Sequence, residues 1–248
     1  ERLGCYLKSD SADLSVLKNK IPTPNIEINS NSSFPIGNLQ NGIKKANASN
    51  SSIEKALNQA FEAAGTRAIV VVQNNQIVAE RYREGFDGNT PQLGWSMSKS
   101  IVNALIGILV QQGKLELEQA APVAAWQNDE RRNITINHLL QMNSGLDWVE
   151  DYTQISDATK MLFRSPSMGK YAIHKKAKHK PNEHWLYASG TSNILAEIIR
   201  QQFDSEEAYW NFPYEALLHK INAYSFQLEA DQSGTYVGSS YTYATPRD

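Results

Sequence analysis

The alternation of apolar and polar residues predicts a β-hairpin near residue 75. Residues 68–72 form a short β-branched run, and residues 76–82 form a second run in which apolar and polar side chains are mixed. The pair Asn74-Asn75 between them is typical of a tight turn. We therefore expect two strands joined at these asparagines, and the apolar first run indicates a strand that is buried on both faces.

The spacing of apolar residues predicts helices both before and after this hairpin. A helix is expected over residues 53–64, capped by Ser52 and ended by Gly65. A longer one is expected over residues 96–112, ended by Gly113, and it is apolar nearly all round, which is typical of a buried central helix. Two shorter amphipathic helices are predicted over residues 135–142 and 191–203, residues 85–91 are expected to be loop, and residues 226–243 look strand-like.

This order of elements, strands first, then helices, then strands again, indicates an α+β fold with an antiparallel sheet flanked by helices and a mainly helical insertion. We expect residues 1–66 to form an N-terminal arm and a first helix, with the Asn-, Ser-, Pro- and Gly-rich residues 22–52 as its loop. Residues 67–248 would form one domain: the start of the sheet at 67–92, a helical region at 93–220 and a return to the sheet at 221–248.

Composition narrows the classes of partner. Hydrophobic residues make up 41% of the 248 residues and charged residues 20%, an ordinary globular balance. The net charge of −2 predicts no nucleic-acid partner, and no apolar run reaches the roughly 18 residues of a membrane span. With the single cysteine Cys5 and no metal-binding motif, we expect no internal disulfide, no metal and no cofactor.

The candidate chemistry begins with Ser96-Met97-Ser98-Lys99, at the start of the apolar helix. Residues three apart on a helix are neighbours, so the serine hydroxyl and the lysine amine can meet. A helix N-terminus adds free N–H groups, and the Ser96 N–H could donate to an oxyanion. Alone, Ser-x-x-Lys usually marks the start of a surface helix. Here residues 100–110 carry no charge, which favours a buried lysine that can act as a base.

Two further segments carry candidate site residues. Tyr187-Ala188-Ser189-Gly190 precedes the helix over residues 191–203, and a tyrosine beside a Ser–Lys pair can relay a proton to a leaving group. Without that pair, such a tyrosine is more often a packing residue. Asp151-Tyr152 could face a substrate, with loop packing as the alternative.

Four stretches in the same order resemble the penicillin-recognising serine enzymes, the β-lactamase-like superfamily. Ser96–Lys99 is similar to the family's Ser-x-x-Lys element, residues 134–146 to its "ITI-x-x-LL-x-M-x-SGL" stretch, and Tyr187–Ser189 to its Tyr-x-Asn/Ser element. The ending, with Glu229, Asp231, Gly234 and residues 237–241 and 243–248, resembles the 6-aminohexanoate-dimer hydrolase and class C β-lactamase-related branch.

The resemblance implies a serine hydrolase that works through an acyl-enzyme, with Ser96 as nucleophile, Lys99 as base and Tyr187 as proton relay. Ser189 and Tyr152 would bind the substrate, a small ester or amide such as a linear amide or amino-acid oligomer. The resemblance also leaves a β-lactam or a D-amino-acid peptide as a candidate substrate, but β-lactams are less favoured because Ser189 stands where class C β-lactamases have asparagine. We favour a periplasmic or secreted bacterial protein over a cytoplasmic one.

The family's third element, Lys/His-x-Gly on a late strand, is not found in the chain. We therefore expect that the C-terminal part of the fold, with the second oxyanion donor, lies beyond Asp248, and that this segment is itself a partner of the chain.

Other classes of hydrolase fit the sequence less well. Gly94-Trp95-Ser96-Met97-Ser98 fails the Gly-x-Ser-x-Gly pattern of α/β-hydrolases at its last position, and no histidine stands out for a Ser-His-Asp triad. A penicillin-binding sensor-type domain, which is acylated and does not turn over, remains the alternative. A degenerate scaffold is disfavoured because Ser96, Lys99 and Tyr187 are all present.

Overall fold

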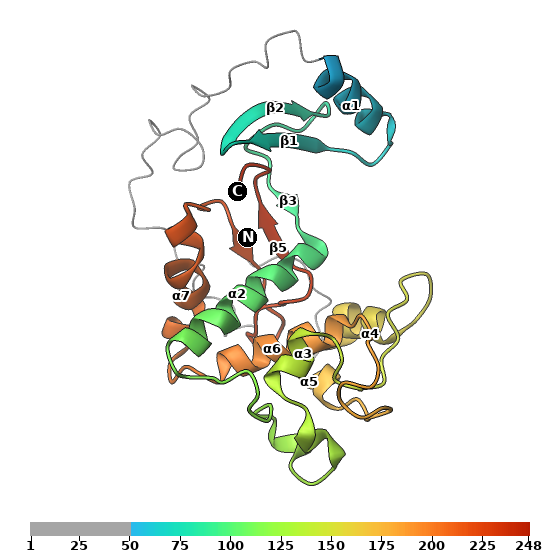
Figure 1. Cartoon of the computed structure of the whole chain (residues 1–248), viewed down its shortest axis with the longest axis vertical. Coiled ribbons are helices and arrows are strands. Elements are labelled where there is room, and N and C mark those ends of the chain that lie inside the picture. Colours follow the sequence, from blue (N-terminus) through green and yellow to red (C-terminus); the bar gives the residue numbers. More distant parts are fainter. Residues whose placement is uncertain (1–50) are drawn as a thin grey trace. The chain divides into compact units, whose positions relative to one another are not determined.

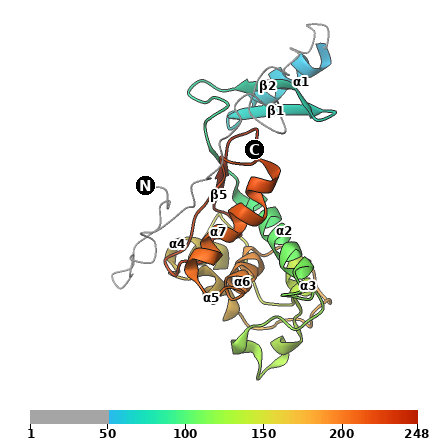
Figure 2. The same ribbon diagram turned by 90° about the vertical axis from the view of Figure 1, so that its left-hand side faces the viewer.

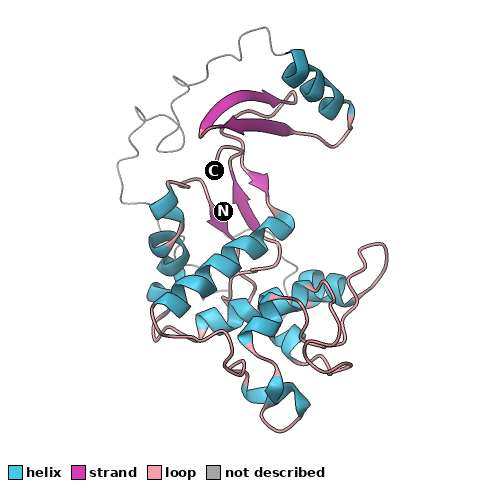
Figure 3. Ribbon diagram, viewed as in Figure 1, coloured by secondary structure: helices cyan, strands magenta, loops and turns pink. Residues whose placement is uncertain are grey.

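The computed structural model describes residues 51–248, so most of the predicted arm at residues 22–52 lies outside the described residues. The described chain divides into two compact units. The first comprises Gly94–Leu217 and Gln227–Thr242, and the second comprises residues 51–93, Leu218–Phe226 and Tyr243–Asp248. Figure 1 traces both units along the chain, and Figure 3 shows that the first is mainly helical while the second carries the hairpin.

The second unit contains the predicted hairpin. Strands β1 (Ala68–Gln73) and β2 (Gln76–Tyr82) pair antiparallel, with a register shift between Val71 and Val72. Asn74 and Asn75 have φ of 52° and 57°, the left-handed conformation that asparagine tolerates in a two-residue hairpin turn. The hairpin and its turn are therefore confirmed.

The predicted burial of β1 is wrong: its side chains are half-buried or exposed. In the described part of this unit, one α-helix, α1 (Ser51–Glu62), and the short 3₁₀ helix Leu218–Ile221 accompany the hairpin, and so few elements can cover only one of its faces. Arg81 on β2 donates to Glu54 and Asn58 on α1, at 2.7 Å and 2.6 Å. The unit also holds the two-residue strand β3 (Gln92–Leu93), which pairs antiparallel with the end of β5 (Thr242–Ala244).

The first unit is built around the apolar helix α2 (Ser98–Gln111). Its buried side chains include Val102, Leu105 and Leu109, while Asn103 and Gly107 are exposed, so the helix is less completely buried than its composition predicted. Gly113 follows α2 with φ of 70°, as expected of the glycine after a helix. Figure 2 shows α2 beside the helices α6 (Ser189–Arg200) and α7 (Glu206–Ala216), on which it packs.

This unit also contains three shorter α-helices, α3 (Ile136–Leu140), α4 (Asp157–Arg164) and α5 (Met168–Ile173), and the 3₁₀ helices Ala124–Trp126 and Glu130–Asn133. Helix α3 lies inside the predicted range 135–142 and is capped by the Thr135 hydroxyl, which accepts from the His138 N–H. Helices α3 and α5 both contact α6. Among the residues that the structure describes, no helix is long and apolar enough to cross a membrane.

Residues 226–243 form much less regular strand than their pattern predicted. Only β4 (Gln227–Leu228) and the start of β5 are strands, and the rest is turns and irregular chain with one isolated antiparallel bridge, between Ala230 and Tyr236. The reason is a side chain that competes with sheet pairing: the Asp231 carboxylate accepts from the backbone N–H groups of Ser233 and Thr235. Gly234, with φ of 85°, completes this turn.

Candidate active site

A tight turn presents Ser96 immediately before α2. Residues Trp95–Met97 form a 3₁₀ turn, and Trp95 has φ of 45°, a conformation that is strained for a bulky residue. The turn is held from both sides, because the Gly94 N–H donates to the Thr242 carbonyl at 2.7 Å and the Ser98 hydroxyl lies 2.8 Å from the Thr242 hydroxyl. A side chain at position 94 would meet that Thr242 hydroxyl, so glycine is required there. Ser96 itself remains exposed.

The amine of Lys99 meets three oxygen atoms. Its Nζ lies 3.0 Å from Ser96 Oγ, 3.2 Å from Ser189 Oγ and 2.9 Å from the Ser239 carbonyl oxygen. The three-residue spacing on a helix accounts for the first contact. The other two come from distant parts of the chain, so the half-buried lysine has fixed partners on more than one side.

The Ser239 carbonyl is held in place by a buried asparagine on α6. Asn193, which is 1% exposed, accepts from the Ser239 N–H at 3.2 Å and donates to the Ser239 hydroxyl at 3.0 Å. The preceding Gly238 packs so closely on Val102 of α2 that a Cβ would overlap it. The backbone around Ser239 is therefore fixed against both α6 and α2, which holds its carbonyl at Lys99.

Tyr187 lies next to the same amine. The centre of its ring is 5.0 Å from Lys99 Nζ, within the range of a cation–π contact. A backbone hydrogen bond fixes the segment before Tyr187: the Leu186 N–H donates to the Met142 carbonyl at 2.9 Å. Met142 belongs to the stretch that carries the Ser-Gly-Leu motif. Within residues 51–248, the Tyr187 hydroxyl has no hydrogen-bond partner.

Glu150 is a site residue that sequence reasoning missed. Its carboxylate accepts four hydrogen bonds: from the Trp148 indole and the Ser189 N–H at Oε2, and from the Tyr152 and Ser189 hydroxyls at Oε1. Trp148 reaches it because Gly190 leaves room, as a Cβ at that position would lie 2.7 Å from the indole ring. The only signal in the sequence is an acidic residue between Trp148 and Tyr152 on a loop, which is too common a pattern to single out.

Tyr152 stands at the edge of this group with 54% of its surface exposed. Desolvation of its hydroxyl and the hydrogen bond to Glu150 raise the pKa of Tyr152 to about 12. The hydroxyl therefore stays protonated near neutral pH and can donate a hydrogen bond.

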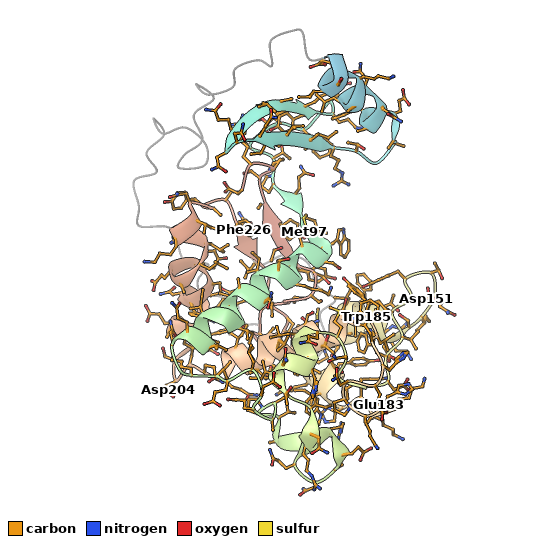
Figure 4. The ribbon with its side chains drawn as sticks, viewed as in Figure 1. Met97, Asp151, Glu183, Trp185, Asp204 and Phe226 are labelled. Atoms are coloured by element: carbon orange, nitrogen blue, oxygen red, sulfur yellow. The ribbon has the colours of Figure 1, made fainter. Side chains whose placement is uncertain are left out.

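Large apolar side chains that are exposed to solvent flank these residues in the sequence. Trp95 and Met97 adjoin Ser96 and are 50% and 70% exposed, and Trp185, two residues before Tyr187, is 65% exposed. Figure 4 labels Met97 at the N-terminal end of α2, and Trp185 on a loop. Among the described residues, no cluster of three or more His, Cys, Asp or Glu side chains could hold a metal ion.

The structure thus brings together the five residues singled out from the sequence. Lys99 contacts Ser96, Tyr187 and Ser189, and the Tyr152 hydroxyl is 3.4 Å from Ser189 Oγ. Ser189 has no exposed surface, and its hydroxyl is engaged by Lys99 and Glu150. The chemical roles assigned to these residues remain predictions.

A serine at the start of a buried helix, a lysine one turn later and a tyrosine ahead of a second helix define the serine β-lactamase and transpeptidase-like class. The family model described as Beta-lactamase matches residues 54–248, and the chain belongs to this family. This match confirms the hydrolase family that the motifs indicated, and the structural neighbours confirm the α+β fold that the order of elements predicted.

The individual relatives and solved structures share less than a third of their residues with this chain. The 6-aminohexanoate-dimer hydrolase of Paenarthrobacter ureafaciens is 29% identical over 100 residues, which is 39% of this chain and 25% of that protein. The structure of a putative 6-aminohexanoate-dimer hydrolase from Bacillus anthracis superimposes with a TM-score of 0.65 at 22% identity, over 79% of this chain and 54% of that one. D-amino acid amidase from Ochrobactrum anthropi gives a TM-score of 0.58 at 13% identity, over 80% and 68%. The chain thus spans about a quarter of the curated relative and about half of the first structure.

Proposed function

We propose that this protein is a serine hydrolase that cleaves small esters or linear amides through an acyl-enzyme on Ser96. The observation that carries the proposal is the contact of 3.0 Å between Lys99 Nζ and Ser96 Oγ, in a setting where two further acceptors hold the amine in place. An exposed serine paired with a half-buried lysine is the arrangement that nucleophilic catalysis requires.

Acylation follows from this geometry. Neutral Lys99 takes the Ser96 hydroxyl proton while Ser96 Oγ bonds to the carbonyl carbon, and the electron pair of the C=O bond moves onto its oxygen. The Ser96 N–H donates to that oxyanion. When the carbonyl re-forms, the bond to the leaving group breaks, and the Tyr187 hydroxyl delivers a proton to the departing oxygen or nitrogen. Tyr187 is then reprotonated from Lys99, whose ammonium lies against its ring.

Deacylation reverses the roles of the same groups. A water molecule attacks the ester carbon of the acyl-enzyme, gives up one proton to the base formed by Lys99 and Tyr187, and releases the acid as Ser96 Oγ regains a proton. Turnover distinguishes this hydrolase from a sensor domain, in which the acyl-enzyme would accumulate.

The chemistry around the site supports a substrate without a carboxylate beside the scissile bond. Apart from Lys99, the side chains that adjoin Ser96 in the sequence, Trp95 and Met97, are apolar and exposed, and the charged group in contact with Ser189 is the acidic Glu150. A carboxylate such as that of a β-lactam needs a cationic partner, and Lys99 is already bonded to three oxygens. The relatives named as 6-aminohexanoate-dimer hydrolases and a D-amino acid amidase are consistent with linear amides.

The proposal is tested by covalent labelling. A fluorophosphonate probe should react with the full-length protein by loss of fluoride and formation of a phosphorus–oxygen bond to Ser96, and peptide mass spectrometry should place the adduct there. Ser96→Ala is expected to abolish the label, whereas Ser100→Ala, a control one turn further along α2, should keep it. An adduct on another serine, or undiminished labelling of Ser96→Ala, would refute the assignment.

Substrate preference is a separate prediction. We expect kcat/KM for p-nitrophenyl acetate and for a 6-aminohexanoate dimer to exceed that for nitrocefin by roughly tenfold or more, since an unpaired carboxylate costs at least about 1–3 kcal/mol. Steady-state kinetics with the three compounds measure the ranking. Faster turnover of nitrocefin than of both other compounds would contradict it.

A further inference from the structure

We infer that Glu150 is a positioning residue that makes the Ser189 hydroxyl a pure acceptor and thereby aims the lone pair of Lys99 at Ser96. This inference rests on the proposed function of Ser96 and Lys99 and adds a residue to it. It concerns the chain of hydrogen bonds from Glu150 through Ser189 and Lys99 to Ser96, in which the joined atoms are 2.5 Å, 3.2 Å and 3.0 Å apart.

The argument is a count of protons. A protonated Lys99 has three N–H bonds, and it faces three acceptors, namely Ser96 Oγ, Ser189 Oγ and the Ser239 carbonyl. A neutral Lys99 keeps two N–H bonds and gains a lone pair. That lone pair is useful for catalysis only if it points at Ser96, so the other two oxygens must not donate to it.

The Ser239 carbonyl cannot donate, but a hydroxyl can either donate or accept. Ser189 has one hydroxyl proton, and the hydrogen bond of 2.5 Å to Glu150 Oε1 takes it. A hydrogen bond to a carboxylate is stronger than one to a neutral acceptor, so this direction is fixed. Of the three oxygens around the amine, only Ser96 Oγ can then donate its proton to the Lys99 nitrogen.

The remaining bonds of Glu150 explain why a carboxylate is needed. Its Oε2 accepts from two N–H groups, the Trp148 indole and the Ser189 backbone, and neither can reverse. In Glu150→Gln the amide oxygen must therefore occupy the Oε2 position, and the –NH₂ must face the two hydroxyls. The amide would then donate to Ser189 Oγ and turn the Ser189 proton toward Lys99, where it competes with Ser96.

This predicts that Ser189→Ala suppresses the effect of Glu150→Gln. In the full-length protein we expect Glu150→Gln to lower kcat/KM for p-nitrophenyl acetate by roughly 10–100-fold, the size of one misdirected hydrogen bond to a charged group. Ser189→Ala should cost less, because it removes the competitor together with one acceptor. The double variant should have the same kcat/KM as Ser189→Ala alone. Adding Ser189→Ala should therefore restore activity to Glu150→Gln.

Asp147→Asn is the matched control. It neutralises another acid of the same loop, whose carboxylate pairs with the exposed Lys178 at 3.2 Å, and it should change the rate by less than about twofold. Melting temperatures confirm that each variant is folded at the assay temperature. If Glu150→Gln does not fold, Glu150→Ala takes its place in the experiment, because removing the carboxylate also frees the Ser189 proton. The loss of kcat/KM caused by Glu150→Ala should likewise disappear when Ser189→Ala is also present.

The outcomes separate the two proposals. Independent, multiplicative losses from Glu150→Gln and Ser189→Ala would overturn the inference, since a merely structural role of Glu150 gives no suppression. A Glu150→Gln rate equal to that of the unmodified protein would also overturn it. In both cases an inactive Ser96→Ala would leave the proposed function standing, whereas an active Ser96→Ala would remove the proposed function itself.

Discussion

Lys99→Ala and Lys99→Arg are each expected to lower kcat for ester hydrolysis by roughly 10³-fold while the protein stays folded. Alanine removes the amine that takes the Ser96 proton. Arginine keeps the positive charge, but a guanidinium does not lose its proton near neutral pH and so offers no lone pair. Steady-state kinetics with p-nitrophenyl acetate, together with circular dichroism to verify folding, measure both effects.

The arginine variant shows whether Lys99 acts as a base or only supplies a positive charge. Near-normal activity of Lys99→Arg would show that Lys99 acts only as a cation and would refute its role as base. Lys114→Ala is the control: this exposed lysine lies just beyond the other end of α2 and contacts the Gln202 carbonyl at 3.4 Å. Its removal should leave kcat unchanged.

Gly145→Ala is expected to destabilise the first unit by roughly 3–5 kcal/mol, a large fraction of the stability of a typical domain. Gly145 has φ of 78°, which a residue with a Cβ adopts only under strain. A Cβ there would also overlap the His179 carbonyl oxygen, and the clash is with backbone that cannot swing away. The midpoint of urea denaturation should fall accordingly.

Gly107→Ala is the matched glycine control and should have the opposite sign. Gly107 is exposed inside α2, and nothing lies within 4 Å of the position of a Cβ. Alanine is a better helix former than glycine, so we expect a gain of about 0.5–1 kcal/mol. Equal destabilisation by both substitutions would show that the local geometry of Gly145 is not the cause.

The local elements were predictable where short-range chemistry decides. The Asn74-Asn75 turn and the glycine after α2 each depend on residues within one or two turns of the chain, and both are found. The prediction of local structure failed where contacts between distant parts of the chain, or an individual side chain, determine the backbone conformation. The left-handed Trp95 ahead of Ser96, held through Thr242, and the turn formed by the Asp231 side chain in a strand-like segment have no local signature.

The candidate site divides in the same way. The amino-acid order was sufficient for the pairing of Ser96 with Lys99, because three residues make one helical turn, and for the family to which the motifs belong. The partners that hold Lys99 depended on the folded chain. Ser189 and Ser239 are 90 and 140 residues away from Lys99, and Glu150 acts through Ser189. Hydrogen bonds act over about 3 Å, so no pattern of neighbours in the sequence reports them; only the packing of α2 on α6 brings these atoms together.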